Sequence, residues 1–213
     1  MKDKGEIKNR LRGLLDPVVR FLSSLGISPT MVTIFGLLIS AVGAIFAARG
    51  SLFIAGLILL VSGICDTLDG SLARLQKSVS IFGAFIDSTG DRIMELFYFG
   101  ALIFYYLAQG TFGAIMIFVV LVALSGSLLT SYVRARAEGL GLECTVGWLE
   151  RPERVTALVI GLLLGRVVLV ISLLFIAAMS VVTVFQRILH VKRISGTVGE
   201  SETSTPLELE KRD

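Results

Sequence analysis

The sequence predicts an all-α integral membrane protein with six transmembrane helices and an N-terminal amphipathic helix on the membrane surface. Hydrophobic residues make up 54% of the 213 positions and charged residues only 17%, which is more apolar surface than one soluble core of this length can bury. Six runs approach the roughly 20 apolar residues needed to cross a bilayer. The predicted spans are residues 30–48, 53–74, 83–108, 111–136, 152–165 and 167–190. A turn at Gly165-Arg166 separates the last two, because an unbroken helix there is too long for one crossing.

The distribution of Lys and Arg predicts which side of the membrane each connection occupies. Basic residues accumulate on the cytoplasmic side, and here they crowd before the first span, between spans two and three, around the connection between spans four and five, and after the last span. Only Arg49 and Arg166 fall in the other three turns. Both termini are therefore expected in the cytoplasm.

The two ends of the chain are predicted to lie outside the membrane domain. Residues 1–29 form a cytoplasmic lead, in which apolar residues share one helical face with basic residues opposite, as in helices that lie on a membrane surface. That face consists of Ile7, Leu11, Leu14, Leu15, Val18 and Leu22. A helix packed on a partner is the alternative. Residues 30–190 form the six-span membrane domain, and residues 191–213, rich in Ser, Thr and Glu, are expected to be a disordered cytoplasmic tail.

Four aspartates within predicted spans carry the functional signal, because carboxylates in a membrane segment are costly and indicate a functional site. Asp66 and Asp69 lie in the cytoplasmic half of span two, and Asp87 and Asp91 in the first turns of span three. Spacings of three and four place each pair on one helix face. Four carboxylates close together repel unless they are neutralised, and hard oxygen ligands suit Mg²⁺ or Mn²⁺. A site for two such ions is the simplest interpretation.

These aspartates belong to the pattern D-x2-D-G-x2-A-R-x8-G-x3-D-x3-D, in which every fixed position is present. The matching residues are Asp66, Asp69, Gly70, Ala73, Arg74, Gly83, Asp87 and Asp91. The sequence thereby resembles the CDP-alcohol phosphatidyltransferase family, and the six-span layout is similar to that family too. A shorter family motif, P-N-x-x-T, is matched at Pro29 and Thr33 but carries Thr30 in place of Asn, which weakens any role for position 30.

The resemblance implies a role for each matched residue. Asp66, Asp69, Asp87 and Asp91 are expected to bind metal, and Asp91 also to deprotonate the acceptor hydroxyl as the catalytic base. The residues expected to meet the CDP group are Asp66, Asp69, Gly70, Ala73, Arg74 and Gly83. The family also implies a homodimer in the plasma or inner membrane of a prokaryote, with the active site facing the cytoplasm, and no nucleic acid polymer as partner.

A group of arginines at cytoplasmic helix ends suggests a second phosphate site, because guanidinium groups bind phosphate well. The group comprises Arg134, Arg136, Arg151, Arg154 and Arg187. The alternative is topological, since basic residues gather at cytoplasmic ends without any ligand. Residues 131–138 and 148–154 resemble the phosphatidylinositol-phosphate synthase branch, in which positions matching Ser131, Arg134, Arg154 and Arg187 contact the phosphate of inositol phosphate. Arg151 is added to this acceptor set from its position.

The expected reaction joins CDP-diacylglycerol, or its archaeal ether analogue, to inositol phosphate and releases CMP. Glycerol 3-phosphate, which also carries a phosphate, is the nearest alternative acceptor, whereas serine leaves the arginines unused. A divalent-cation transporter is a remote alternative, since buried acids also line ion paths. A purely structural protein gives no reason to bury four acids. Gly161 and Gly165 form a small-residue pair suited to seat a neighbouring helix.

Overall fold

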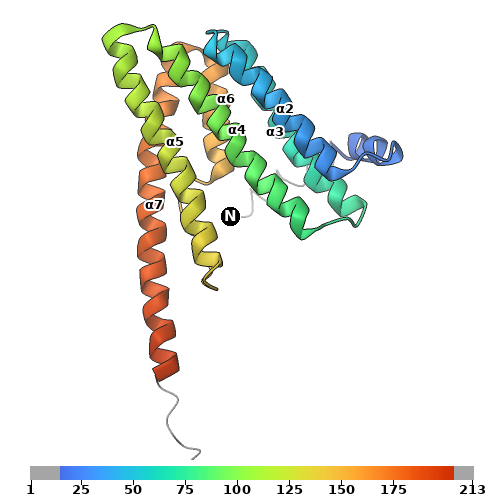
Figure 1. Cartoon of the computed structure of the whole chain (residues 1–213), viewed down its shortest axis with the longest axis vertical. Coiled ribbons are helices and arrows are strands. Elements are labelled where there is room, and N and C mark those ends of the chain that lie inside the picture. Colours follow the sequence, from blue (N-terminus) through green and yellow to red (C-terminus); the bar gives the residue numbers. More distant parts are fainter. Residues whose placement is uncertain (1–14, 204–213) are drawn as a thin grey trace, which may run out of the picture.

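The protein is all-helical in the part that the structure describes, as the sequence predicts. The computed structural model describes residues 15–203, with side chains to residue 195. After a helical stretch at residues 15–24, six helices follow in order. They are α2 (Pro29–Ala48), α3 (Leu52–Leu75), α4 (Ile81–Leu107), α5 (Gly110–Glu138), α6 (Arg151–Leu164) and α7 (Arg166–Thr203) (Figure 1).

Local sequence signals explain where these helices begin and end. Ser28 and Ser80 cap α2 and α4, each accepting a hydrogen bond from the backbone N–H of the third residue on, Met31 or Gly83. Gly165 divides α6 from α7 because it adopts φ +96°, a conformation that residues with a Cβ rarely take. The turn expected at Gly165-Arg166 is therefore present.

The six helices pack in a closed ring. Taken around the ring, the neighbouring pairs are α2 with α3, α3 with α6, α6 with α7, α7 with α5, α5 with α4, and α4 with α2. In this order α4 and α6 lie on opposite sides. Helices far apart in the sequence thus become neighbours. The ends of α3 and α5 and the starts of α4 and α6 lie toward the same end of the bundle, although the end of α5 lies apart from the connection between α3 and α4 (Figure 1).

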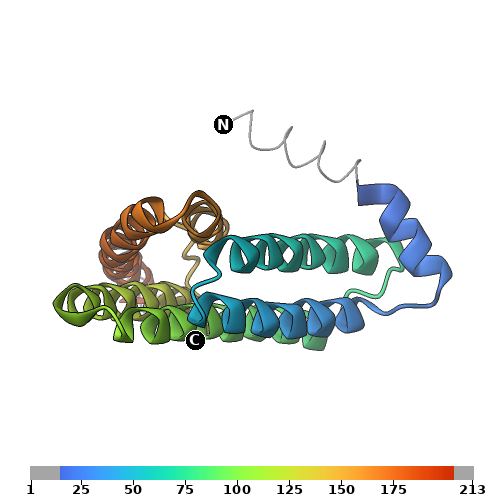
Figure 2. The same ribbon diagram turned by 90° about the horizontal axis from the view of Figure 1, so that it is seen from above.

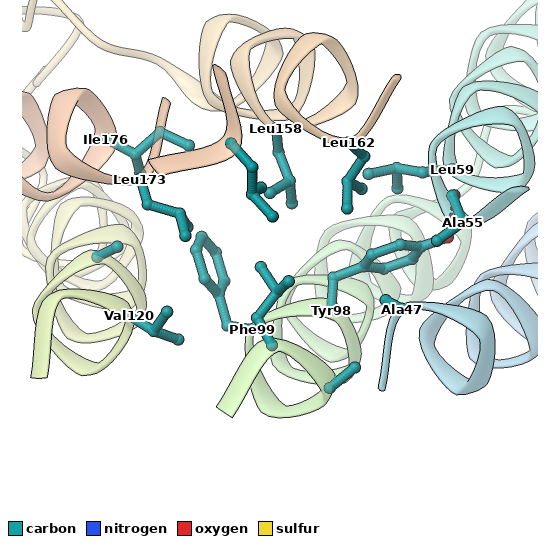
Figure 3. Packing of buried hydrophobic residues seen from close by; sticks show 14 of the residues in the cluster. Ala47, Ala55, Leu59, Tyr98, Phe99, Val120, Leu158, Leu162, Leu173 and Ile176 are labelled. Atoms are coloured by element: carbon teal, nitrogen blue, oxygen red, sulfur yellow. Dashed lines mark hydrogen bonds between the residues drawn. The ribbon is translucent and has the colours of Figure 1, made fainter. Parts of the chain in front are cut away.

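An apolar core fills the ring and fixes the helices relative to one another. Figure 3 shows Phe99 of α4 pointing toward Leu173 of α7, and Tyr98 of α4 pointing toward Ala55 of α3 and Ala47 of α2. The hydroxyl of Tyr98 donates to the Ala55 carbonyl oxygen at 3.0 Å, which pairs the one polar atom of that ring with α3. The core is therefore continuous between the halves of the bundle that carry the two candidate sites.

Close approach of helix backbones depends on small residues. A Cβ at Gly161 would lie 2.9 Å from Ser172 Oγ and 3.0 Å from Leu169 Cα, so this glycine seats α7 of the same chain against α6. A Cβ at Gly165 would meet nothing within 4 Å. Of the pair expected to seat a neighbouring helix, Gly161 does so within the chain and Gly165 forms the turn.

Four helices are long and apolar enough to cross a membrane: α2, α3, α5 and residues 166–195 of α7. The other two of the six expected spans do not meet that description, for physical reasons. The 14 residues of α6 span about 21 Å, less than the roughly 30 Å of a hydrocarbon core. The helix α4 is long enough, but it carries Asp87, Asp91, Arg92 and Glu95.

The N-terminal helix at residues 15–24 packs on the protein itself. Val19 is buried against Val32 of α2 and against Cys65, Leu68 and Leu72 of α3, with Leu15 and Leu22 beside it. Val18, placed on the same apolar face by the sequence, is exposed. Figure 2 shows this helix leaving the bundle at an angle to α2. Ile7, Leu11 and Leu14 lie outside the described residues.

The last helix continues to Thr203, beyond residue 190, where the sequence analysis ended the final span. Residues 191–194, Val-Lys-Arg-Ile, include no helix breaker, so nothing in the sequence stops the helix at the membrane surface. Its end projects past the other helices (Figure 1). Residues 204–213 lie outside the described part.

Candidate functional site

The structure brings the four signature aspartates together where α3 ends and α4 begins. One carboxylate oxygen from each of Asp66, Asp87 and Asp91 lies within 4.8 Å of the others. Asp69 is buried beside them, and it lines one small cavity with Asp66 and Asp91 and a larger one with Asp87. Because residues 76–80 form a short connection, the two aspartate faces of the helical hairpin turn toward each other.

These residues fit a divalent cation. Asp87 Oδ1 is buried and has no hydrogen-bond partner among the described residues, so a carboxylate oxygen is left available in a cluster of like charges. All the donor atoms are hard carboxylate oxygens, which Mg²⁺ and Mn²⁺ prefer. A metal ion there would supply the positive charge that these carboxylates need.

Thr33 on α2 fixes one of the aspartates. Its hydroxyl donates to Asp69 Oδ2 at 2.6 Å. A hydroxyl donor to one oxygen of a carboxylate holds that carboxylate in a single orientation and leaves the other oxygen for a ligand. Thr33 therefore couples α2, whose first five residues form the P-x-x-x-T motif, to the acidic cluster.

Arg151 lies among the aspartates rather than with the other arginines. Its guanidinium contacts Asp66 Oδ1 at 3.2 Å and Asp91 Oδ1 at 2.5 Å, so it bridges α3 and α4 from the first residue of α6. Arg92 also contacts Asp91, at 3.5 Å. Arg151 was predicted to belong to the acceptor group, and in the structure its direct partners are carboxylates.

A cavity of about 440 Å³ adjoins the cluster and is lined by the residues expected to meet the CDP group, except Asp66. A Cβ added to Gly70 would sit 3.6 Å from Arg74 Nη1, so the missing side chain leaves open space next to that guanidinium. Arg74 is exposed, and its Nη2 donates to Ser71 Oγ. The residues that line this cavity include Thr33, Asp69, Gly70, Ala73, Arg74, Gly83 and Asp87.

Three of the remaining arginines cluster where α5 ends and α6 begins. Arg187 of α7 lies close enough to Arg134 and Arg154 for their charges to interact. Its Nε donates to the Val146 carbonyl oxygen at 2.9 Å and its Nη1 to that of Thr130 at 2.5 Å. We call Arg134, Arg154 and Arg187 the arginine cluster.

The other two members of the arginine cluster have carboxylate partners. Arg154 is paired with Glu95 of α4 at 3.0 Å, and both side chains are buried. Arg134 is paired with Glu138 at 2.8 Å on the exposed face of α5. Ser131 is half-buried beside Thr130. Arg187 has only carbonyl oxygens as hydrogen-bond partners among the described residues, and Glu150 lies close enough for its charge to interact with that guanidinium.

Sequence reasoning did not single out Glu95 or Thr130. Glu95 follows Asp91 by four residues, so helical spacing alone puts a fifth carboxylate on the aspartate face of α4. That signal was present but lay outside the signature. No signal in the sequence pointed to Thr130, because its contacts with Arg154 and Arg187 depend on how three helices pack together.

The fold and the site define a helical membrane protein whose carboxylate cluster is suited to a divalent metal. A family model for CDP-alcohol phosphatidyltransferase matches residues 26–186. Archaetidylinositol phosphate synthase of Methanothermobacter thermautotrophicus is 34% identical over 185 residues, which cover 85% of this chain and 90% of that protein. The chain belongs to the CDP-alcohol phosphatidyltransferase family and is a transferase of phospholipid biosynthesis.

Solved structures agree with this assignment. Phosphatidylinositol phosphate synthase of Mycobacterium tuberculosis with CDP-DAG bound superposes with a TM-score of 0.76 at 32% identity, covering 82% of this chain and 92% of that one. The same protein in complex with manganese and citrate gives a TM-score of 0.77 at the same identity, covering 82% and 87%. The resemblance inferred from the signature is confirmed, and a transferase rather than a cation transporter follows from the family.

Proposed function

We propose that this chain transfers a phosphatidyl-type group from a CDP-linked lipid, CDP-diacylglycerol or its archaeal ether analogue, to inositol phosphate. The arginine cluster carries this proposal, because it gives a phosphorylated acceptor a positively charged partner next to the acidic site. Two relatives, an archaetidylinositol phosphate synthase at 34% identity and a phosphatidylinositol phosphate synthase at 32% identity, support the same acceptor.

In the proposed reaction, an acceptor hydroxyl attacks the lipid-bearing phosphorus of the donor. An oxygen–phosphorus bond forms to the acceptor, the bond from that phosphorus to CMP breaks, and Asp91 takes the hydroxyl proton. Asp66, Asp69, Asp87 and Asp91 would hold the metal, with two Mg²⁺ or Mn²⁺ ions as the fuller proposal. Bound metal would offset negative charge on the diphosphate.

The remaining residues would orient the two substrates. Gly70, Ala73, Arg74 and Gly83 would border the CDP group, with Arg74 offering a planar cation to phosphate. Ser131 and the arginine cluster would hold the acceptor phosphate. Arg151 contacts Asp66 and Asp91, so it would stand between the two substrates and meet phosphate at their junction.

The proposed topology has six spans with both termini and the site in the cytoplasm of a prokaryotic cell. Although α6 is short and α4 is charged, each packs between two other helices of the ring, which supports their crossing with the rest. Charges on α4 face partners such as Arg151 and Arg154 rather than lipid. The lead at residues 1–29 is proposed to lie at the membrane surface, and the protein to form a homodimer.

An acceptor assay tests the proposal. Purified protein with CDP-diacylglycerol and Mn²⁺ is given inositol phosphate, glycerol 3-phosphate or serine in turn, and CMP release is measured. We expect turnover with inositol phosphate, and a kcat/KM for it roughly tenfold or more above that for glycerol 3-phosphate. Turnover with glycerol 3-phosphate alone would replace the proposed acceptor, while no CMP release with any alcohol would argue against the reaction itself.

A further inference from the structure

Two ion pairs cross the helical ring between α4 and α6. Asp91 pairs with Arg151 at 2.5 Å, and Glu95 pairs with Arg154 at 3.0 Å. A step of four residues on α4 and of three on α6 each advances about one helical turn, so the pairs stack as two rungs. The first rung belongs to the aspartate site. The second lies one turn deeper and is outside the family signature.

Burial makes the second rung costly. Glu95 and Arg154 are only 5% and 4% exposed, and the Glu95 Oε1 atom accepts from Arg154 Nε at 3.2 Å and from Nη2 at 3.0 Å. Taking two charges out of water costs more than burying apolar residues of similar volume. A contribution to stability therefore does not by itself account for this pair.

The pair fixes the orientation of the Arg154 guanidinium. Besides its two bonds to Glu95, that group donates through Nη1 to Thr130 Oγ1 at 3.2 Å and to the Leu149 carbonyl oxygen at 3.5 Å. Four of its five N–H groups are thus directed at protein atoms, and one on Nη2 remains for a ligand. If Glu95 lost its charge, a buried cation would be left without a counter-charge.

Thr130 links Arg154 to Arg187, another member of the arginine cluster. Its side chain accepts from Arg154, while its carbonyl oxygen accepts from Arg187 at 2.5 Å. Arg187 in turn holds the Val146 carbonyl oxygen in the connection between α5 and α6. A shift of Arg154 would therefore move both Arg187 and this connection, which also contains Leu149.

We propose that Glu95 is a positioning residue for the acceptor: from the metal-bearing helix α4 it holds Arg154, and through Arg154 and Thr130 it arranges the phosphate-binding arginines. This inference rests on the proposed function. It assigns Glu95 no contact with metal or donor, so its loss is expected to affect one substrate only.

The test is the steady-state kinetics of Glu95→Gln, which keeps the shape and an accepting oxygen but removes the charge. We expect the KM for inositol phosphate to rise roughly tenfold or more, the size found when a group that orients a ligand is lost. The KM for CDP-diacylglycerol and the Mn²⁺ affinity, measured by titration without substrate, are expected to change by less than about twofold. Glu95→Asp, which keeps the charge, should recover part of the loss.

Tyr98→Phe is the matched control for a purely structural role. It removes another buried polar contact of α4, the hydrogen bond to Ala55, at a distance from the arginine cluster. Both variants should lower the melting temperature, but only Glu95→Gln should raise the acceptor KM. A Glu95→Gln enzyme whose two KM values match those of Tyr98→Phe, or rise together, overturns the inference.

A second variant covers the case in which Glu95→Gln does not fold. Thr130→Val removes the hydroxyl that Arg154 contacts without leaving a charge unpaired. It should raise the acceptor KM selectively, by about threefold to tenfold, as expected for one lost hydrogen bond, and an unchanged acceptor KM contradicts the inference. If wild-type protein shows no turnover with inositol phosphate, the proposed function fails instead, so the two failures are distinguishable.

Discussion

The acidic cluster and the arginine cluster are built in opposite ways. All four aspartates come from one helical hairpin, α3 and α4, within residues 66–91. The arginines come from α5, α6 and α7 and depend on the connection between α5 and α6. Asp87 Oδ1 of the first site has no hydrogen-bond partner among the described residues, whereas two of the three arginines already have a carboxylate partner within the chain.

The acidic cluster is therefore suited to bind a cation, whereas the arginine cluster is held in place by contacts within the chain. In the part of the chain that the structure describes, the four carboxylates have only Arg151 and Arg92 as ion-pair partners, and crowded carboxylates favour cation binding, so we expect the donor site to depend on metal. Arginines tied to Glu95, Thr130 and backbone carbonyls are positioned before any ligand arrives, which lowers the entropic cost of binding a phosphate. Variants in the two regions should therefore fail in different ways.

The largest effect is expected for Asp91→Asn. Loss of the proposed general base should lower kcat by roughly a hundredfold or more, measured as CMP release at saturating donor and acceptor. Asp16→Asn, at an exposed position on the N-terminal helix, is the control and should leave kcat within about twofold. An Asp91→Asn enzyme with nearly normal kcat would remove Asp91 from the base role and leave it as a metal ligand only.

A smaller effect on the same site is expected for Thr33→Val. Without the hydroxyl that donates to Asp69 at 2.6 Å, Mn²⁺ affinity should fall about tenfold, the low end for losing a group that orients a metal ligand. The control is Thr67→Val, because the Thr67 hydroxyl donates only to Gly63 within its own helix. Titration of Mn²⁺ into the two proteins gives the comparison. Equal Mn²⁺ affinities of the two variants would show that the hydrogen bond from Thr33 to Asp69 does not contribute to metal binding.

The acidic cluster could be predicted from sequence because its geometry is local. Spacings of three and four put Asp66 with Asp69 and Asp87 with Asp91 on single faces, and a short connection brings the end of α3 close to the start of α4, so the two faces can meet. The helices themselves were predictable for the same reason, since apolar runs and the Gly165 break mark them directly. What the sequence could not supply was Thr33 as the partner of Asp69, 36 residues away.

The arginine cluster was only partly predictable because its geometry is long-range. Positions at cytoplasmic helix ends identified Arg134, Arg154 and Arg187, but not which of them face one another. Arg151 and Arg154 are one turn apart on α6, yet one meets Asp66 and Asp91 while the other meets Glu95. That division is set by the ring order of the helices, which places α6 opposite α4.

The connection between α5 and α6 offers a test confined to the acceptor side. Gly147 adopts φ +137°, and a Cβ there would lie 2.6 Å from Thr183 Cγ2 and 3.4 Å from Arg187 Nε. Gly147→Ala should displace Arg187 and raise the KM for inositol phosphate about threefold to tenfold, with the donor KM unchanged. Gly141→Ala is the control, because φ is also positive but a Cβ meets nothing within 4 Å. A rise in the donor KM as large as that in the acceptor KM would contradict the separation of the two sites.

The smallest effect on catalysis is expected for Gly161→Ala, which changes the scaffold that both sites share. The added Cβ must push Leu169 and Ser172 of α7 away from α6, and overpacking of this kind costs about 1–3 kcal/mol of stability. Thermal unfolding in detergent should show the loss, while kcat and both KM values well below the melting temperature should stay within about twofold. Gly63→Ala, where a Cβ meets nothing, should show neither change. A selective rise in acceptor KM for Gly161→Ala would mean that the contact between α6 and α7, and not Glu95 alone, determines where Arg154 and Arg187 lie.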